Sequence, residues 1–139
     1  MLNEILNLKK IRVEMAVLKS SEKELEKPML DDFSFIPTLY GWFLEILENM
    51  TCPPNPDSAF QRKKFLFVAV MLYSPATFCG KPVKEGLCAE LAKLFNLTPV
   101  SVSRNISGMI FYYENYRDFA DGVEKIYVEI LHRLKDVSV

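Results

Sequence analysis

A tight turn at residues 96–99, set between two amphipathic runs, constrains the fold of this 139-residue chain more than any other feature. Asn96 follows the last apolar position of the first run, and Asn enters the left-handed backbone region at lower cost than most residues, so it can end a helix. Thr98 offers a side-chain oxygen as an N-cap, and Pro99 suits the first helical position, where no backbone N–H is needed. The turn therefore predicts one helix that ends at Asn96 and another that begins at Thr98 or Pro99.

The helices on either side of this turn are expected to cross through their apolar faces. The first helix is predicted to begin near residue 84 or 85. At about 100° per residue, the buried side of the second helix consists of Val102, Ile106, Met109, Ile110 and Tyr113. Its opposite side carries Val100, Arg104 and Ser107, with Ser103 on the flank. The residues expected to be buried where the helices cross are Leu91, Ala92, Leu97 and Val102. A small polar face with one arginine suits a helix in the major groove, because small side chains let the backbone approach and arginine can pair with guanine.

The run from Ala92 to Ile106 resembles the helix-turn-helix motif of bacterial repressors. In that family an alanine is followed four residues later by a turn glycine, then by a hydrophobic residue and Ser or Thr, with a Val-Ser-Arg run in the second helix. This chain matches the pattern at Ala92, Leu97, Thr98, Val102, Ser103 and Arg104. It departs from the pattern at Asn96, usually Gly, and at Asn105, usually apolar.

The resemblance covers residues 87–108 and implies a DNA-reading surface. The residues implied to contact bases are Thr98, Pro99, Val100, Ser103, Arg104 and Ser107. The alternative is a pair of packed helices that does not bind nucleic acid. A basic helix start followed by a loop and a helix pair also loosely resembles the C-terminal DNA-binding domain of bacterial replication initiators, at the level of fold alone.

Positive charge is concentrated on the segment that holds the motif. The chain as a whole has a net charge of −1, but residues 58–108 carry seven basic and two acidic side chains. The net charge is therefore +5 for residues 58–108, −4 for residues 1–57 and −2 for residues 109–139. This distribution is typical of phosphate contacts, although a solvated basic face is the alternative. The residues expected to contact phosphates are Arg62, Lys63, Lys64, Lys81, Lys84 and Lys93.

Composition and periodicity predict an all-α fold of five to six helices, with a helix-turn-helix core and an N-terminal helical extension. Half of the residues are hydrophobic, only five are glycine, and apolar residues recur at three- and four-residue steps. The run from Phe65 to Tyr73 is apolar nearly all round, which favours a central helix. A buried strand is the alternative, but no neighbouring segment offers a partner strand. The run is too short to span a bilayer, so no membrane partner is expected.

Prolines at positions 53, 54 and 56 divide the chain into two predicted parts. Residues 1–52 are expected to form an N-terminal helical pair, with Trp42 packed on the first helix, and residues 57–139 to form the DNA-binding body. The two parts are expected to belong to one structural domain. The first helix, residues 1–27, carries a heptad stripe of Met1, Leu8, Ile11, Met15, Leu18 and Leu25. This stripe is expected to pack on the body or to form a homodimer. As a dimer surface it is preferred to the alternative, the C-terminal helix face around Ile126, Ile130 and Leu134.

No arrangement of residues indicates catalysis, a cofactor or a metal. Three cysteines and the single His132 lack ligand spacing, and no signal peptide is visible, so a cytoplasmic protein that is not an enzyme is expected. The sequence therefore predicts a small sequence-specific protein that binds double-stranded DNA, either a transcriptional regulator or a replication or mobile-element factor. It would read the major groove with the helix from Pro99. The alternative function is a helical protein–protein interaction module without nucleic-acid binding.

Overall fold

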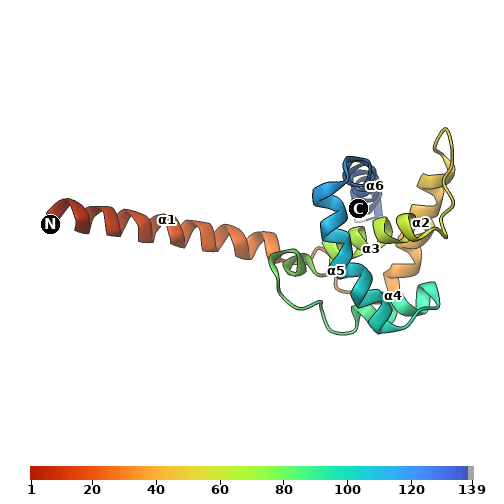
Figure 1. Ribbon diagram of the computed structural model, residues 1–139, viewed down its shortest axis with the longest axis horizontal. Helices are drawn as coiled ribbons and strands as arrows, with labels where there is room; N and C mark the ends of the chain where they lie inside the picture. The colour runs from red at the N-terminus through yellow and green to blue at the C-terminus, as the bar shows by residue number, and fades with distance from the viewer. Residues whose placement is uncertain (138–139) are drawn as a thin grey trace.

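The computed structural model describes residues 1–137, and these residues form helices but no strand. The prediction of an all-α fold is confirmed. The helices are α1 (Leu2–Glu26), α2 (Ile36–Glu48), α3 (Ala59–Tyr73), α4 (Leu87–Phe95), α5 (Pro99–Asn115) and α6 (Arg117–Val137), with short 3₁₀ helices at Phe33–Phe35 and Pro75–Cys79. Figure 1 shows a rounded body that contains α2 to α6, from which α1 projects.

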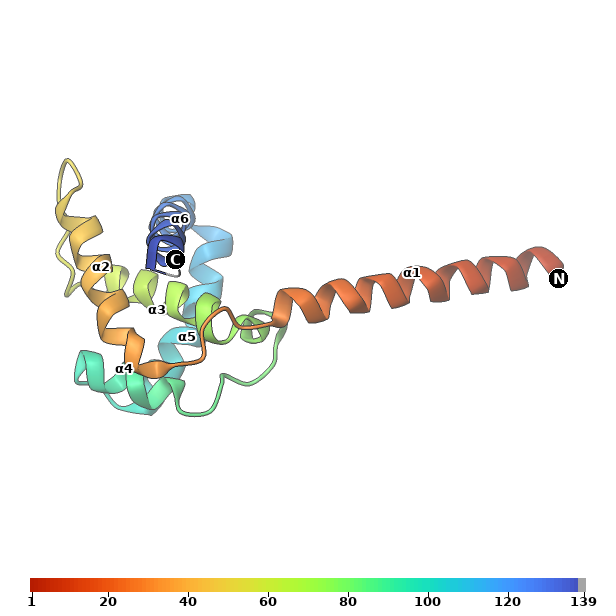
Figure 2. The ribbon, with the colours of Figure 1, turned by 180° about the vertical axis from the view of Figure 1, so that it is seen from behind.

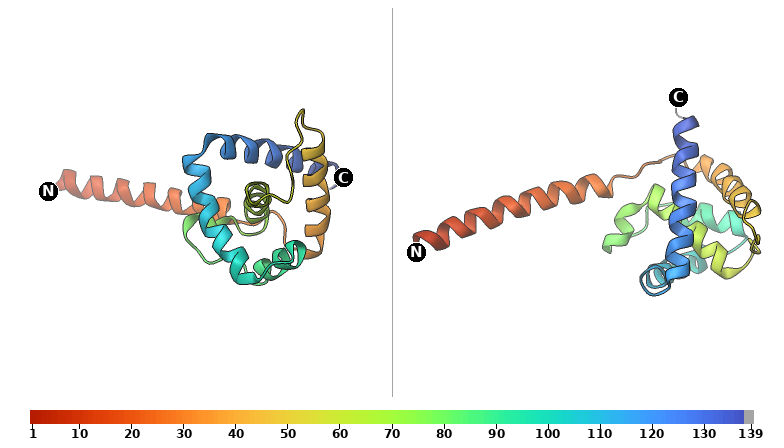
Figure 3. Two further views of the ribbon diagram at one scale, coloured as in Figure 1. Left: turned by 45° about the vertical axis from the view of Figure 1, so that its right-hand side comes forward. Right: turned by 90° about the horizontal axis from the view of Figure 1, so that it is seen from above.

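Helix α3 runs through the centre of the body, as its apolar run predicts. In Figure 3 (left) it is seen nearly end-on, with α2, α4, α5 and α6 arranged around it. Every residue from Phe65 to Val70 is buried, because the charged side chains of this helix are confined to its start. Ser58 caps that start by accepting a hydrogen bond from the backbone N–H of Gln61 at 3.2 Å. A helix that is apolar on all sides is stable only when other helices cover it, and the remaining helices of the body do so.

Aromatic packing joins α3 to its neighbours. The ring of Phe65 lies 5.1 Å from Tyr40 and 5.4 Å from Phe43, both on α2, and 5.9 Å from Phe95 at the end of α4. On the other side, α6 buries one apolar stripe made of Phe119, Val123, Ile126 and Ile130. The positions of α4 and α5 are therefore fixed by a shared core.

Helix α1 contributes no buried residue to this core. Figure 2 shows from behind that it extends away from the body. The prediction of an N-terminal helical pair in residues 1–52 is wrong, because α2 buries its own apolar stripe against the body instead. Trp42 likewise contacts the ring of Phe35 at 5.4 Å rather than packing on α1 as expected. The proline-rich segment thus connects two helices of one body.

Two further features of the chain concern its helix boundaries and hydropathy. Helix α4 begins at Leu87, two or three residues later than predicted, because Gly86 adopts a left-handed conformation with φ 88°. A β-carbon at that position would lie 3.1 Å from the ring of Phe33, so both the backbone and the packing favour glycine. Within residues 1–137, no helix combines the length and the apolar character that crossing a bilayer requires.

Candidate nucleic-acid interface

The turn between α4 and α5 has the local geometry that its residues predict. Asn96 lies in the left-handed region with φ 56° and ψ 44°, and it ends α4. The backbone N–H of Leu97 then donates to the carbonyl of Ala92 at 2.9 Å. Thr98 caps α5 by accepting a hydrogen bond from the backbone N–H of Ser101 at 3.1 Å, and Pro99 occupies the first helical position. Four adjacent residues therefore fix the direction in which α5 leaves α4.

The two helices cross through small and branched apolar residues. Leu91, Ala92 and Val102 are buried at the crossing, as expected, whereas Leu97 is only half-buried. Ile106 and Met109 continue the buried side of α5 into the body. One side of α5 is thereby committed to the core, and the opposite side faces outward.

The outward face of α5 consists largely of small or polar side chains around one arginine. The exposed residues on or beside it are Thr98, Pro99, Val100, Ser103, Arg104 and Ser107, the complete set expected to contact bases. Within the described part of the chain, Arg104 has no hydrogen bond or ion pair. The hydroxyl of Ser107 donates to the carbonyl of Ser103 at 3.2 Å. The sequence from Leu91 to Tyr113 contains no acidic residue, so no carboxylate of this run opposes an anionic ligand.

One flank of this face borders the loop that follows α3. Ser103 and Ser107 line a groove together with Lys81, and residues 77, 80, 82 and 83 form its other wall. Lys81 is held at this place because its ammonium pairs with Glu26 of α1 at 2.6 Å. That hydrogen bond is the main reason why the pKa of Lys81 is raised. A cation therefore lies beside the small residues of α5.

The other flank borders the start of α3. Arg62 lines a narrow groove with Ser101 and Asn105 of α5. The ammonium of Lys63 lies 5.1 Å from the centre of the Tyr112 ring. Asn105, where the chain departs from the repressor pattern, is half-buried and donates its amide N–H to the carbonyl of Ser101 at 3.0 Å. Asn105 therefore does not disturb α5. With Arg62 and Lys63 on this flank and Lys81 on the other, positive charge is present on both flanks of the outward face.

One of the lysines expected to contact phosphates is not available at this surface. Lys64 is buried, and its ammonium lies 4.7 Å from the centre of the Phe60 ring. Burial lowers the pKa of Lys64, so it belongs to the core rather than to an anion site. Its assignment to phosphate contacts is corrected for this reason. No sequence signal distinguishes Lys64 from Lys63, because its burial depends on α6, which lies far along the chain.

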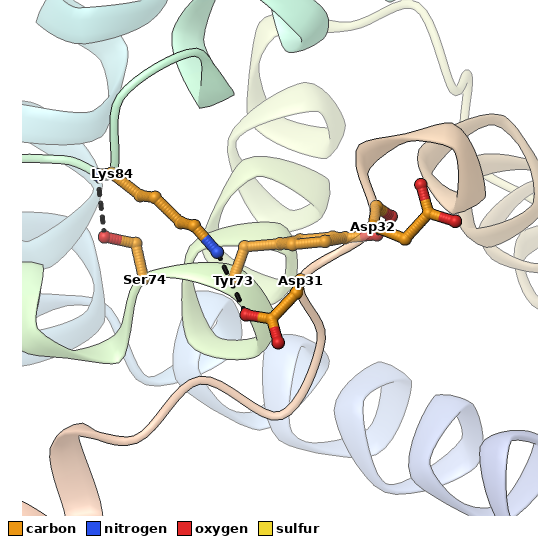
Figure 4. A network of polar contacts seen from close by, with 5 residues as sticks. All are labelled: Asp31, Asp32, Tyr73, Ser74 and Lys84. Carbon is orange, nitrogen blue, oxygen red and sulfur yellow. Dashed lines mark hydrogen bonds and ion pairs between the residues drawn. The ribbon is translucent and has the colours of Figure 1, made fainter.

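Lys84 is occupied by a network that joins the N-terminal connector to the body (Figure 4). Its ammonium donates to Asp31 at 3.1 Å, and its backbone N–H donates to the hydroxyl of Ser74 at 3.0 Å. The phenol of Tyr73 donates to the backbone carbonyl of Asp32 at 2.7 Å in the same network. Lys84 therefore anchors the connector, which its spacing in the sequence does not reveal.

Lys93, by contrast, remains accessible on the exposed side of α4. Its ammonium pairs with Glu90 one turn earlier at 3.2 Å, and its side chain is 74% exposed. Exposed pairs of this kind contribute little to stability, so an anion can replace the carboxylate. The structure therefore brings Arg62, Lys63, Lys81 and Lys93 around the helix pair, and burial removes Lys64 from that set. Lys84 pairs with Asp31 of the connector.

Metal-binding and disulfide chemistry are not indicated in residues 1–137. No group of three or more His, Cys, Asp or Glu side chains is placed to hold a metal ion there, and Cys52, Cys79 and Cys88 are free thiols. Comparison of the chain with protein-family models, with curated proteins and with solved structures found no match. Any functional conclusion therefore depends on the geometry of this site.

Proposed function

We propose that this chain is a small sequence-specific DNA-binding protein, either a transcriptional regulator or a replication or mobile-element factor, that inserts α5 into the major groove. The observation that carries the proposal is the outward face of α5. It is small and polar, it contains Arg104 without a partner in the described residues, and it has cations on both flanks. A helix with these properties can approach base edges while the flanking cations contact phosphates.

The proposed roles follow from position. Arg104 pairs with a guanine, and Ser103 and Ser107 contact neighbouring base edges or the sugar–phosphate backbone. Thr98, Pro99 and Val100 form the end of α5 that enters the groove. The cations on the two flanks of α5 contact phosphates. They are Arg62, Lys63, Lys81 and Lys93. DNA binding also requires a compartment that holds DNA, which agrees with the cytoplasmic location expected from the sequence.

The first experiment compares Arg104→Ala with Arg117→Ala, a matched change of an exposed arginine at the start of α6. A DNA site is selected from a random pool, and affinity is measured by fluorescence anisotropy on that site and on random duplex. Arg104→Ala is expected to lose about 1–3 kcal/mol on the selected site and much less on random duplex. Equal losses of affinity on both duplexes would show that Arg104 contacts a phosphate and does not read a base. Absence of salt-dependent binding by the unchanged protein would exclude the proposal.

The second experiment tests the flanking cations through the salt dependence of binding. Arg62→Gln and Lys63→Gln should each lower the slope of log K against log salt by about one unit, because each removes one phosphate contact. Lys125→Gln, an exposed lysine on α6, is the matched control and should leave the slope unchanged. If the double change at positions 62 and 63 behaves like the control, the start of α3 is not part of the interface.

A second candidate function, a protein–protein interaction module, is favoured by α1. Large apolar residues are exposed along the whole helix: Met1, Leu2, Ile5, Leu6, Leu8, Ile11, Val13, Met15, Val17, Leu18 and Leu25. We propose that the partner is a second copy of the chain, paired through the heptad stripe. In a parallel pair, Glu14 of one copy and Lys19 of the other occupy the flanking positions that form interhelical ion pairs. A homodimer would present two copies of α5, which suits DNA with two half-sites.

A further inference from the structure

A cavity lies on the side of the body that carries the second half of α5. It is half-open, has a volume of about 480 Å³, and lies between α3, the 3₁₀ helix at 75–79, α5 and α6. The residues that line it are Phe67, Met71, Phe78, Ile110, Tyr113, Glu114, Val123, Glu124 and Tyr127. Its volume falls within the range of cavities that bind small molecules in proteins.

The walls of this cavity are aromatic and already ordered. The ring of Phe67 stacks on Tyr113 at 4.9 Å with an interplanar angle of 22°. The centre of the Phe67 ring also lies 4.7 Å from the centre of the Phe78 ring. Tyr127 adds a fourth ring, and burial raises the pKa of its phenol, so this ring is neutral at physiological pH. Four aromatic rings therefore line one cavity.

The charges that line the cavity are all negative. Glu114 and Glu124 are exposed carboxylates at its edge, and none of its lining residues is Lys, Arg or His. Glu124 is held by the phenol of Tyr113, which donates to it at 2.9 Å. The grooves beside the outward face of α5 differ in this respect, because they contain Lys81 or Arg62.

Aromatic faces and carboxylates together select one class of ligand. The negative face of an aromatic ring attracts a cation, and ring clusters commonly recognise ammonium groups. A carboxylate at the edge adds a Coulombic attraction and disfavours an anionic ligand. We propose that this cavity binds a small organic cation, an amine or quaternary ammonium that carries an apolar body.

The experiment uses three probes that share a phenylalkyl body: (4-phenylbutyl)trimethylammonium, the neutral 5-phenylpentan-1-ol and the anionic 5-phenylpentanoate. Affinities are measured by calorimetry on the full chain without DNA, and the site is identified from the methyl NMR signals of Met71 and Ile110. The ammonium probe is expected to bind about tenfold more tightly than the alcohol, with the carboxylate weakest. Equal affinities for cation and alcohol, or no shift of those methyl signals, would overturn the proposal.

Matched variants separate the local charges from the overall charge. Glu114→Gln combined with Glu124→Gln should abolish the preference for the cation while binding of the alcohol persists. Asp121→Asn combined with Glu129→Gln also removes two charges, but from exposed positions of α6 outside the cavity lining, and should preserve the preference. Equal loss of preference in both variants would mean that net charge alone attracts the probe, contrary to the proposal.

A dilution series without any probe tests whether a second copy of the chain, rather than a small molecule, covers the cavity. If the Met71 and Ile110 signals shift as the protein is diluted, a second copy covers the cavity and the proposal fails. Signals that do not depend on concentration leave the cavity open to the ammonium probe, as proposed. Since no arm of the experiment contains DNA, its outcome is independent of whether α5 binds DNA. Ile110 also lines the groove that holds Ser103 and Ser107, so the cavity adjoins the proposed DNA surface.

Discussion

Helices α1 and α3 are both rich in apolar residues, yet they occupy opposite environments. The 25 residues of α1 include none that is buried, whereas ten of the 15 residues of α3 are buried. The difference lies in where the charges fall. In α3 the charged side chains occupy residues 62–64 and, apart from Gln61, the rest is apolar or aromatic, whereas in α1 charges recur from Glu4 to Glu26. The distribution of charge along a helix, rather than its apolar content, decides which helix can enter a core.

The two helices also differ in the contacts that hold them in place. Helix α3 is held by four neighbours, so its stability is part of the stability of the whole body. Helix α1 meets the body only near its C-terminal end, where Glu26 pairs with Lys81. Isolated helices are marginally stable in water, and most helical stability in proteins comes from packing of an apolar face. The exposed stripe of α1 is therefore the surface that the proposed homodimer would bury.

The largest expected effect tests the contrast directly. Phe65→Ala should destabilise the body by about 3–5 kcal/mol, because it removes a buried ring that contacts α2 and α4. Leu18→Ala on α1 is the comparison, and in dilute protein it should change stability by less than about 0.5 kcal/mol. Urea unfolding of both variants measures the two values. Similar losses in the two variants would show that α1 packs on the body in solution.

The crossing of α4 and α5 gives the next largest effect. Ala92 is buried where the helices meet, so Ala92→Leu should overpack the crossing and cost about 1–3 kcal/mol. Ala89→Leu, on the exposed side of the same helix, should have almost no effect. Thermal unfolding of the pair provides the comparison. An unchanged melting temperature for Ala92→Leu would mean that the two helices do not cross at this residue.

Sequence reasoning succeeds where the structure is determined locally. The turn at Asn96, the cap at Thr98 and the start of α5 at Pro99 depend on neighbouring residues and were predictable. The central position of α3 was also predictable, since a helix that is apolar all round has no face to expose.

Sequence reasoning fails where a contact joins distant parts of the chain. The burial of Lys64 depends on α6, where Gly122 lies close to its side chain. The pairing of α2 with the body rather than with α1 has the same origin, because its apolar stripe alone does not identify its partner. The exposure of the outward face of α5 could therefore be predicted from the sequence, whereas the burial of Lys64 could not.

A smaller effect is expected at the junction between the connector and α3. Burial, and then the charge of Asp32, raises the pKa of Tyr73 to about 12 from its ordinary value of 10.0. Because the folded protein favours the neutral phenol, the stabilisation is complete below pH 10 and is lost as the pH rises from 10 through 12. Tyr73→Phe removes the hydrogen bond to Asp32 and should cost about 0.5–1.5 kcal/mol at neutral pH.

The same variant should lose less stability at alkaline pH than the unchanged protein. Urea unfolding at steps from pH 8 to pH 12 measures this difference. Tyr116→Phe, at a half-exposed position, is the matched control and should follow the unchanged protein at every pH. A parallel alkaline loss in Tyr73→Phe and the unchanged protein would assign the loss to other groups.

The smallest effect on the body is expected from α1, and it is the one that decides what α1 is for. Leu8→Glu combined with Met15→Glu places charges in the heptad stripe, where each would face the partner helix in a dimer. The body should unfold at the same urea concentration as before, because neither residue is buried in the chain. Sedimentation should nevertheless show the unchanged protein as a dimer and the variant as a monomer.

Val13→Glu combined with Ser20→Glu is the matched control, since it adds the same two charges at exposed positions on the side of α1 opposite the stripe. It should leave the dimer intact. If all three proteins sediment as monomers across the concentration range, the homodimer is excluded and the apolar stripe of α1 must serve a different partner. If all three remain dimers, the interface lies on the body, and α1 is excluded as the surface that pairs two copies.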